Sequence, residues 1–419
     1  MTFAILALLL TVQQSDTIRI NYANLLEIAE KYSPALKEIK FNINASRSGL
    51  AADIMSFLGS GEFSITKTEN TYSSPPYSGI SPWYSSTLNL STNLLSSGNL
   101  FRTLSSYFDY RNNQVNLEDL RSQILLNLKT QYLNTIKLKK TSEAYTKALE
   151  RSKLYYNLVL QRFKLGMVSK IDMVTAEIEL KNAEINLLSS QNAYKKSLEQ
   201  LRALIGVTDA GTALELEDYD PPVNVVLPDS PANIINATLR YNPSIKGSRG
   251  LMNAARTNVL YTITSFVPQV SFGKTWYYES SDLPEGLSNY NEKEGWTIRA
   301  YVNILNYPFS VLKNAELERA YSYRYKKTIY EAISKVRSSY EDLQYYFQTL
   351  ELAKLRLEKA QSAYELASEQ YKEGLISILQ LMDTEASLLQ SEVGLIEAKY
   401  NFTIAKENIN YLAGMEVIK

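Results

Sequence analysis

The sequence has 419 residues, with 44 basic and 44 acidic side chains, no cysteine and no histidine. A balanced charge argues against a nucleic-acid partner, because such a partner would need a basic face. Disulfides and thiol chemistry are excluded, and the commonest general base and metal ligand is missing. We therefore expect a protein without cofactor or metal that is not an enzyme.

The chain begins with a short apolar run, FAILALLLTV, at residues 3–12. This run is too short to cross a bilayer, since a membrane-spanning helix needs about 20 apolar residues. It predicts a signal peptide over residues 1–15, although no basic residue precedes it. The alternative is an apolar start to a soluble helix.

Two long segments of the chain repeat each other. QRFKLGMVSKIDMVTAEIEL at 161–180 returns as EQYKEGLISILQLMDTEASL at 369–388, with a constant offset of 208 residues. A weaker match of YSPAL at 32–36 with YNPSI at 241–245 extends the repeat upstream. We predict a first structural repeat over 16–218, a linker over 219–231, a second repeat over 232–415 and a tail over 416–419.

Each repeat is predicted to contain a helix followed by a strand pair. The strand pairs span 62–95 and 268–305, with strands at 62–69, 83–95, 268–279 and 294–305. Each strand has about the length that a tilted transmembrane strand needs. In the last strand Trp296, Ile298, Ala300, Val302 and Ile304 alternate with polar residues, and we expect this face to contact lipid. A soluble sheet packed on helices would also alternate.

The four predicted strands cannot close a barrel by themselves. Open sheet edges are not tolerated in lipid, so other copies of the chain must complete the sheet if it enters a membrane. About twelve strands from three copies would enclose an aqueous lumen, whereas about eight strands from two copies would be filled by side chains.

A long helical hairpin follows each strand pair, at 97–206 and 309–414. Glycine at 166 and 374 is expected to end the incoming helix, and Ser169 and Ser377 to cap the outgoing one. After each turn a large side chain recurs at every seventh position, which predicts coiled-coil packing. These positions are Met173, Leu180, Leu187, Tyr194 and Leu201 in the first hairpin and Leu381, Leu388, Leu395, Phe402 and Ile409 in the second.

The order of strand pair, hairpin with a Gly-x-x-Ser turn, linker, and the same again resembles the TolC-like outer-membrane efflux proteins. Gln161–Gly206 and Glu369–Gly414 are similar to the recurring signature of that family, and the resemblance covers about residues 20–415. It implies a mainly α fold with a small β part. Duplicated helical hairpins would form an α-barrel, and four β-strands per protomer would complete a trimeric 12-stranded transmembrane β-barrel.

The resemblance also implies a function, that of a homotrimeric channel-tunnel in the lipid of the outer membrane of a Gram-negative-type (diderm) bacterium, extending into the periplasm. The tunnel would conduct substrates exported by an inner-membrane transporter and a periplasmic adaptor. A soluble periplasmic coiled-coil structural protein is the alternative. Such a protein would explain the heptads but not the strand pairs.

Several residues of the hairpin ends take a role from the resemblance. Asp383 matches an acidic position of the tunnel constriction, and Gln380 stands where another acidic residue can occur; a solvated helix face is the alternative for Asp383. Asp172 matches a position that closes the tunnel with an aromatic residue, matched by Tyr371, and a basic one, replaced here by Ile376. The alternative for Asp172 is a local role as the N3 residue of a capping box with Ser169. Adaptor docking, or packing of the turns on their own hairpins, would explain the apolar turn residues. The docking set is Gly166, Met167, Val168, Ser169, Gly374, Leu375, Ile376 and Ser377.

Overall fold

The computed structural model describes residues 17–56, 59–74, 77–95, 97–207, 213–222, 225, 227–228, 230–264, 267, 269–280, 286–299 and 305–418. The predicted signal peptide lies outside these residues. The chain forms two compact units, one from residues 1–38, 118–243 and 330–419 and the other from 39–117 and 244–329. Each unit takes segments from both repeats.

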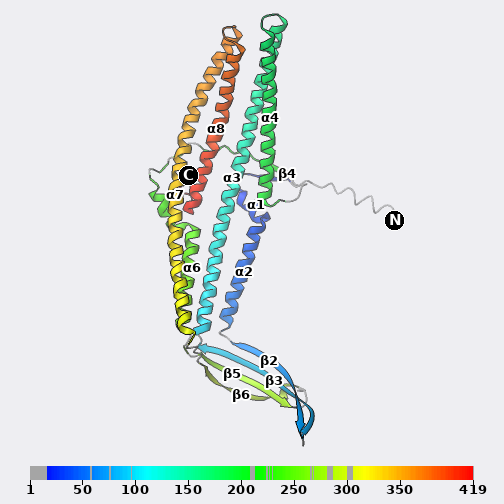
Figure 1. Ribbon diagram of the computed structural model, residues 1–419, viewed down its shortest axis with the longest axis vertical. Helices are drawn as coiled ribbons and strands as arrows, with labels where there is room; N and C mark the ends of the chain where they lie inside the picture. The colour runs from blue at the N-terminus through cyan, green and yellow to red at the C-terminus, as the bar shows by residue number, and fades with distance from the viewer. Residues whose placement is uncertain are drawn as a thin grey trace, which may run out of the picture. The chain divides into compact units, whose positions relative to one another are not determined.

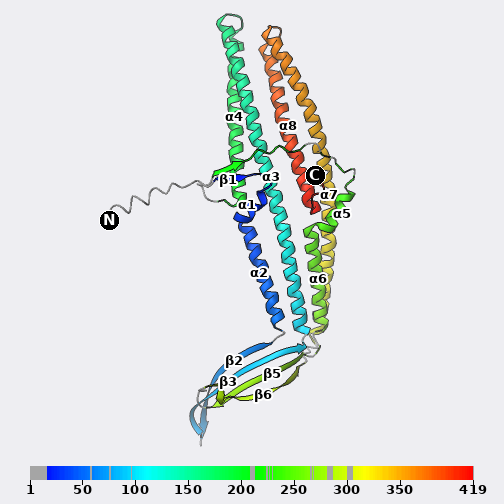
Figure 2. The same cartoon turned by 180° about the vertical axis from the view of Figure 1, so that it is seen from behind.

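Most of two helical hairpins belongs to the first unit (Figure 1). α3 (Ser97–Lys164) and α4 (Lys170–Ile205) form one hairpin, and α7 (Tyr307–Lys372) and α8 (Ile378–Ala413) form the other. The helices follow the order α4-α3-α8-α7, with α3 beside α8 (Figures 1 and 2). Heptad positions such as Leu381, Leu388, Phe402 and Ile409 are buried, which agrees with the predicted coiled-coil packing.

Short elements complete the first unit. β1 (Thr17–Ile20) pairs in parallel with β4 (Ala213–Leu216), and α1 (Leu25–Tyr32) and α5 (Ala232–Tyr241) precede the longer helices of each repeat. β1 and β4 were not predicted, because four-residue strands carry too little periodicity to be recognised. The described part of the linker contains no helix until α5, which follows Pro231.

Glycines end both outgoing helices at equivalent places. Gly206 follows α4 with φ +89° and Gly414 follows α8 with φ +69°, in the left-handed region that only glycine adopts readily. A Cβ at Gly206 would meet the backbone oxygen of Tyr32 at 3.1 Å, and one at Gly414 would meet that of Tyr241 at 2.8 Å. The glycines therefore allow the ends of α1 and α5 to lie against the ends of α4 and α8.

The second unit contains most of α2 (Pro34–Met55) and α6 (Pro243–Thr264), together with an antiparallel sheet in the order β2-β3-β5-β6 (Figure 2). The strands are β2 (Ser60–Ser74), β3 (Tyr77–Leu95), β5 (Gln269–Ser280) and β6 (Asn291–Arg299), with the 3₁₀ turn η1 (Leu287–Asn289) before β6. None of the described helices has the length and apolar character of a membrane span.

Strand ends differ from the sequence prediction in two places. β2 and β3 continue through most of the predicted loop, with pairing as far as Ser74 and Tyr77. Pro82 lies opposite Glu69 of β2 in this extension, outside the pairing of β3 with β5, which begins at Tyr84. The predicted strand 294–305 begins at Asn291 instead, while residues 300–304 lie outside the described chain and Leu305 lies in a turn.

The register divides the sheet into an apolar and a polar face, because residues directly opposite each other share a face. Val270 pairs with Ile298 and Phe272 with Trp296, as the predicted alternation of the last strand requires. The apolar face comprises Phe63, Ile65, Leu88, Leu90, Val270, Phe272, Trp276, Trp296 and Ile298, and the polar face includes Ser64, Thr87, Asn89, Ser271, Thr275 and Thr297. Lys274, Glu292 and Glu294 interrupt the apolar face, and Lys274 pairs with Glu292 at 2.9 Å.

Candidate functional site

Both hairpin turns are closed by the same backbone arrangement. Gly166 and Gly374 have φ values of +72° and +79°, and a Cβ at either position would meet nothing within 4 Å. The amide of Met167 donates to the carbonyl of Arg162 at 2.8 Å, and that of Leu375 donates to Gln370 at 2.9 Å. These bonds satisfy carbonyls that the ends of α3 and α7 leave without a helical partner.

The capping boxes predicted after the turns are both present. Ser169 accepts a hydrogen bond from the amide of Asp172 at 3.1 Å, and the Asp172 carboxylate accepts one from the amide of Ser169 at 3.0 Å. Ser377 and Gln380 make the same reciprocal pair at 3.3 and 3.0 Å. Two of the predicted gate residues, Asp172 and Gln380, therefore also hold the first turn of their own helix.

The four apolar turn residues fall into two classes. Met167 and Leu375 are 69% and 74% exposed. Val168 and Ile376 are half-buried against an apolar cluster that both hairpins share. The cluster consists of Val159, Ala176, Ala367, Tyr371, Ile378 and Leu381. Packing accounts for Val168 and Ile376, whereas nothing in the protomer accounts for the exposure of Met167 and Leu375.

Two further apolar residues share the exposed surface of the hairpin ends. Ile171 and Leu379 lie one turn beyond Met167 and Leu375, are both exposed, and are separated by the 208-residue offset of the repeat. Ile171 and Leu379 were not predicted as docking residues because they lie inside the predicted helices, yet their equivalent positions in the two repeats could have identified them. Asp383 lies farther along α8, and its side chain is exposed in the protomer.

Tyr371, in the last turn of α7, is buried in the apolar cluster that both hairpins share. It is 4% exposed, and its hydroxyl is buried without a hydrogen-bond partner among the described residues. The Arg162 guanidinium lies 5.0 Å from the centre of the Tyr371 ring. It also donates to the carbonyl oxygens of Tyr371 at 3.2 Å and Lys372 at 2.9 Å. Burial raises the pKa of Tyr371, and Asp172 adds to this effect while Arg162 opposes it.

Polar contacts also join α3 to the second hairpin farther from the turns. Arg151 donates to Glu385 and to Glu392, each at 3.2 Å, and its side chain is only 18% exposed. Burial raises the pKa of Glu385, and Arg151 opposes the rise. Another ion pair joins Lys129 to Glu407 at 2.7 Å. The inner helices α3 and α8 are therefore fastened to each other within one protomer.

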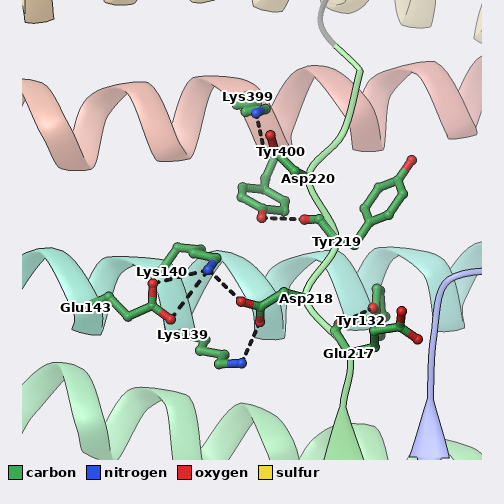
Figure 3. Close-up of polar contacts among 10 residues, drawn as sticks. All are labelled: Tyr132, Lys139, Lys140, Glu143, Glu217, Asp218, Tyr219, Asp220, Lys399 and Tyr400. Carbon is green, nitrogen blue, oxygen red and sulfur yellow. Dashed lines mark hydrogen bonds and ion pairs between the residues drawn. The ribbon is translucent and has the colours of Figure 1, made fainter.

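A strap segment, Glu217–Asp220, runs from β4 across α3 and α8 (Figure 3). The first two residues of the strap bond to α3, and the last two bond to α8. From α3, Tyr132 donates to the Glu217 carbonyl at 2.6 Å, and Lys139 and Lys140 pair with Asp218 at 2.5 and 2.7 Å. From α8, Tyr400 donates to the Tyr219 carbonyl at 2.8 Å, and Lys399 pairs with Asp220. The two lysines of α3 lower the pKa of Asp218. The segment that connects the two repeats thus also ties their hairpins together.

No group of three or more acidic side chains in the described chain is arranged to hold a metal ion. The site consists instead of two exposed helix turns, a shared apolar cluster beneath them, and charged contacts between α3 and the second hairpin.

Comparison with known proteins gives the same architecture. The chain is 23% identical over 278 residues to a probable efflux pump outer membrane protein, TtgC of Pseudomonas putida, covering 64% of this chain and 55% of that protein. It is 23% identical over 312 residues to the outer membrane protein TolC of Escherichia coli, covering 70% and 61%. The match thus spans less than two thirds of the length of either relative.

The fold is that of a solved outer membrane channel. The structure superposes on the Campylobacter jejuni CmeC outer membrane channel with a TM-score of 0.78 at 17% sequence identity, over 94% of this chain and 86% of that one. The model of the outer membrane efflux protein family matches residues 25–207 and 234–415, two stretches that lie within the two predicted repeats. The chain belongs to the outer membrane efflux protein family.

Proposed function

We propose that the protein is an outer-membrane channel-tunnel that conducts substrates exported by an inner-membrane transporter and a periplasmic adaptor. The observation that carries this proposal is the four-stranded sheet with one apolar face and open edges at β2 and β6. Such edges must be paired in lipid, so copies of the chain complete the barrel. Family membership favours this function over that of a soluble periplasmic coiled-coil protein.

The outer helices of the first unit support a closed ring of protomers. Exposed apolar residues follow a helical stripe on α4 and another on α7, the two helices at the edges of the order α4-α3-α8-α7. The stripes contain Ile178, Ile185 and Leu188 on α4 and Leu352, Leu355 and Leu366 on α7. Because the surfaces of α4 and α7 differ, α4 of one copy would contact α7 of the next in a head-to-tail arrangement. Three copies close into a ring when successive copies are related by a threefold rotation.

The exposed apolar residues of the hairpin ends form the docking surface for the adaptor in this proposal. Met167, Ile171, Leu375 and Leu379 are exposed at equivalent positions of the two repeats. Single exposed apolar residues are common, but a repeated set at two exposed helix turns is typical of a binding surface. An adaptor with apolar side chains at a hairpin end would cover them.

The gate lies near the same ends in this proposal. Asp383, with Gln380 one turn before it, forms the constriction, and three copies around an axis would concentrate cations there. Asp172 and Tyr371 close the tunnel at the junction of the two hairpins. Their proximity is supported by the shared apolar cluster, in which Tyr371 is buried and against which Met173, the neighbour of Asp172, packs.

The docking surface can be tested with a double variant. Met167→Asp with Leu375→Asp should leave heat-stable, detergent-extracted trimers and their bilayer conductance intact, because neither side chain packs on the protomer. Recovery of the adaptor by crosslinking in cells should be lost. Lys164→Asp with Lys372→Asp places acids at exposed positions of the same turns and should retain the adaptor. A monomer confined to the soluble fraction would refute the channel itself.

A further inference from the structure

We propose that Arg162 is a positioning residue that fastens the end of α7 to the end of α3 within one protomer, and so holds the tunnel closed. This chain has isoleucine at position 376, where the family resemblance places a basic residue, and Arg162 brings a cation to Tyr371 from the other hairpin. The inference rests on the proposed tunnel, and assigns part of its closure to a contact inside the protomer.

The contact uses carbonyls at the end of a helix. α7 ends at Lys372, and the last four carbonyls of a helix have no partner inside it. The two Nη atoms of Arg162 reach two of these carbonyls, those of Tyr371 and Lys372, at 3.2 and 2.9 Å. The Tyr371 carbonyl also accepts a bond from the Gly374 amide of the turn at 3.1 Å. A cation at the C-terminal end of a helix is also favoured by the helix dipole. The planar guanidinium can make both bonds at once, which a lysine ammonium cannot do in the same geometry.

Arg162 is itself anchored in the first hairpin. The carbonyl of Arg162 accepts the hydrogen bond from the Met167 amide that closes the first turn, so the Arg162 backbone is held in that turn. Its side chain belongs to the contact with the second hairpin. One residue therefore couples the two hairpin ends, and movement of either end away from the other must break its bonds.

Only the first of the two repeats has this arginine contact. The residue equivalent to Arg162 in the second repeat is Gln370, 208 residues later. Its backbone closes the second turn in the same way, but its side chain makes no hydrogen bond to the described residues. An arginine at only one of two equivalent positions is not required to form the turn. Its use is the contact with Tyr371 and Lys372.

Tyr371 depends on this contact for its position. Its ring is buried in the shared cluster, yet its hydroxyl has no hydrogen-bond partner among the described residues. Packing and the guanidinium are thus the interactions that hold the ring. Loss of Arg162 would release the last turn of α7 together with Tyr371, which is the matched closing residue.

The test measures basal conductance of purified trimers in planar bilayers without adaptor, for the wild type, Arg162→Met, Arg162→Lys and Gln370→Ala. Methionine keeps the packing of the aliphatic stem while removing the donors. We expect Arg162→Met to raise the open probability about tenfold, since two charge-assisted bonds are lost. Arg162→Lys should give an intermediate rise, and Gln370→Ala should match the wild type.

The heat stability of the trimers should be unchanged in all variants. Equal open probability in the wild type and Arg162→Met would overturn the proposal, as would an equal rise in Gln370→Ala. If Arg162→Met fails to assemble, Arg162→Lys serves as the test, because lysine retains the positive charge. An open probability of Arg162→Lys equal to that of the wild type would then overturn the proposal. A wild-type protein that neither assembles nor conducts would overturn the proposed function instead.

Discussion

Arg151 of α3 and Glu385 of α8 form an ion pair of 3.2 Å between Nε and Oε1, which joins the two hairpins of one protomer. The same guanidinium bonds to Glu392, so one cation serves two carboxylates in a mostly buried place. Burial nevertheless raises the pKa of Glu385, because the cation compensates only part of the cost of removing that carboxylate from water.

The contacts of Arg151 with the two glutamates predict that removing its charge lowers the free energy of unfolding by an amount that depends on pH. Arg151→Met should destabilise the protomer by about 1–3 kcal/mol at pH 7.5, since two neighbouring carboxylates remain without a partner. The cost should shrink as the pH falls, because Glu385 takes up a proton. Thermal unfolding of the detergent-solubilised protein, followed by circular dichroism at pH 7.5 and 5, measures both values. Arg319→Met removes an exposed ion pair and should cost less than about 0.5 kcal/mol at either pH.

The sign for the wild type follows from the raised pKa. At a pH between the raised pKa of Glu385 and its ordinary value of 4.5, the folded chain binds a proton that the unfolded chain lacks. The contribution of Glu385 to stability therefore grows as the pH falls through this window and is lost as the pH rises above it. Glu385→Gln should remove this dependence. A pH profile identical in Glu385→Gln and wild type would contradict the assignment.

The faces of the sheet predict opposite effects of a charge at neighbouring positions. Ile298→Lys places a charge on the apolar face and should cost about 2–4 kcal/mol per chain near the middle of the bilayer. Thr297→Lys lies on the polar face and should be tolerated. The measurement is the yield of heat-stable trimer in the outer-membrane fraction. Equal yields would mean that β6 does not lie in lipid or that its faces are reversed.

The proposed constriction predicts a change in ion selectivity. Asp383→Asn should lower cation selectivity and the block by multivalent cations in planar bilayers, because a ring of three carboxylates is lost. Folding should be unaffected, since the side chain is exposed in the protomer. Glu365→Asn, at another exposed position of the second hairpin, is the matched control and should conduct as the wild type does. Unchanged selectivity in Asp383→Asn would place this residue outside the tunnel.

Replacement by alanine is expected to lower the free energy of unfolding by different amounts at two glycines of the second hairpin. Gly374→Ala should cost about 1 kcal/mol, since its φ is positive but an added Cβ meets nothing. Gly414→Ala should cost more than about 2 kcal/mol, because its Cβ would lie 2.8 Å from backbone atoms of Tyr241 as well. Thermal unfolding of both variants compares them directly. Equal costs would show that the end of α5 can move away from α8.

Local sequence signals determined much of this protein. Gly166 and Gly374 end helices because the left-handed conformation suits glycine, and Ser169 and Ser377 cap helices because their hydroxyls reach amides three residues later. Alternation in the last strand assigned Trp296 and Ile298 to one face. These features depend on residues close in sequence, so a single chain shows them without its fold.

Contacts between distant segments were decided by the tertiary structure. β1 pairs with β4 across nearly half the chain, and Arg162 meets Tyr371 although 209 positions separate them. The same packing half-buries Ile376 while leaving its neighbour Leu375 exposed. No local pattern distinguishes such partners, because which side chains meet depends on how α3 lies against α7 and α8. The repeat placed both hairpin ends in the sequence, and only their packing made one arginine the link between them.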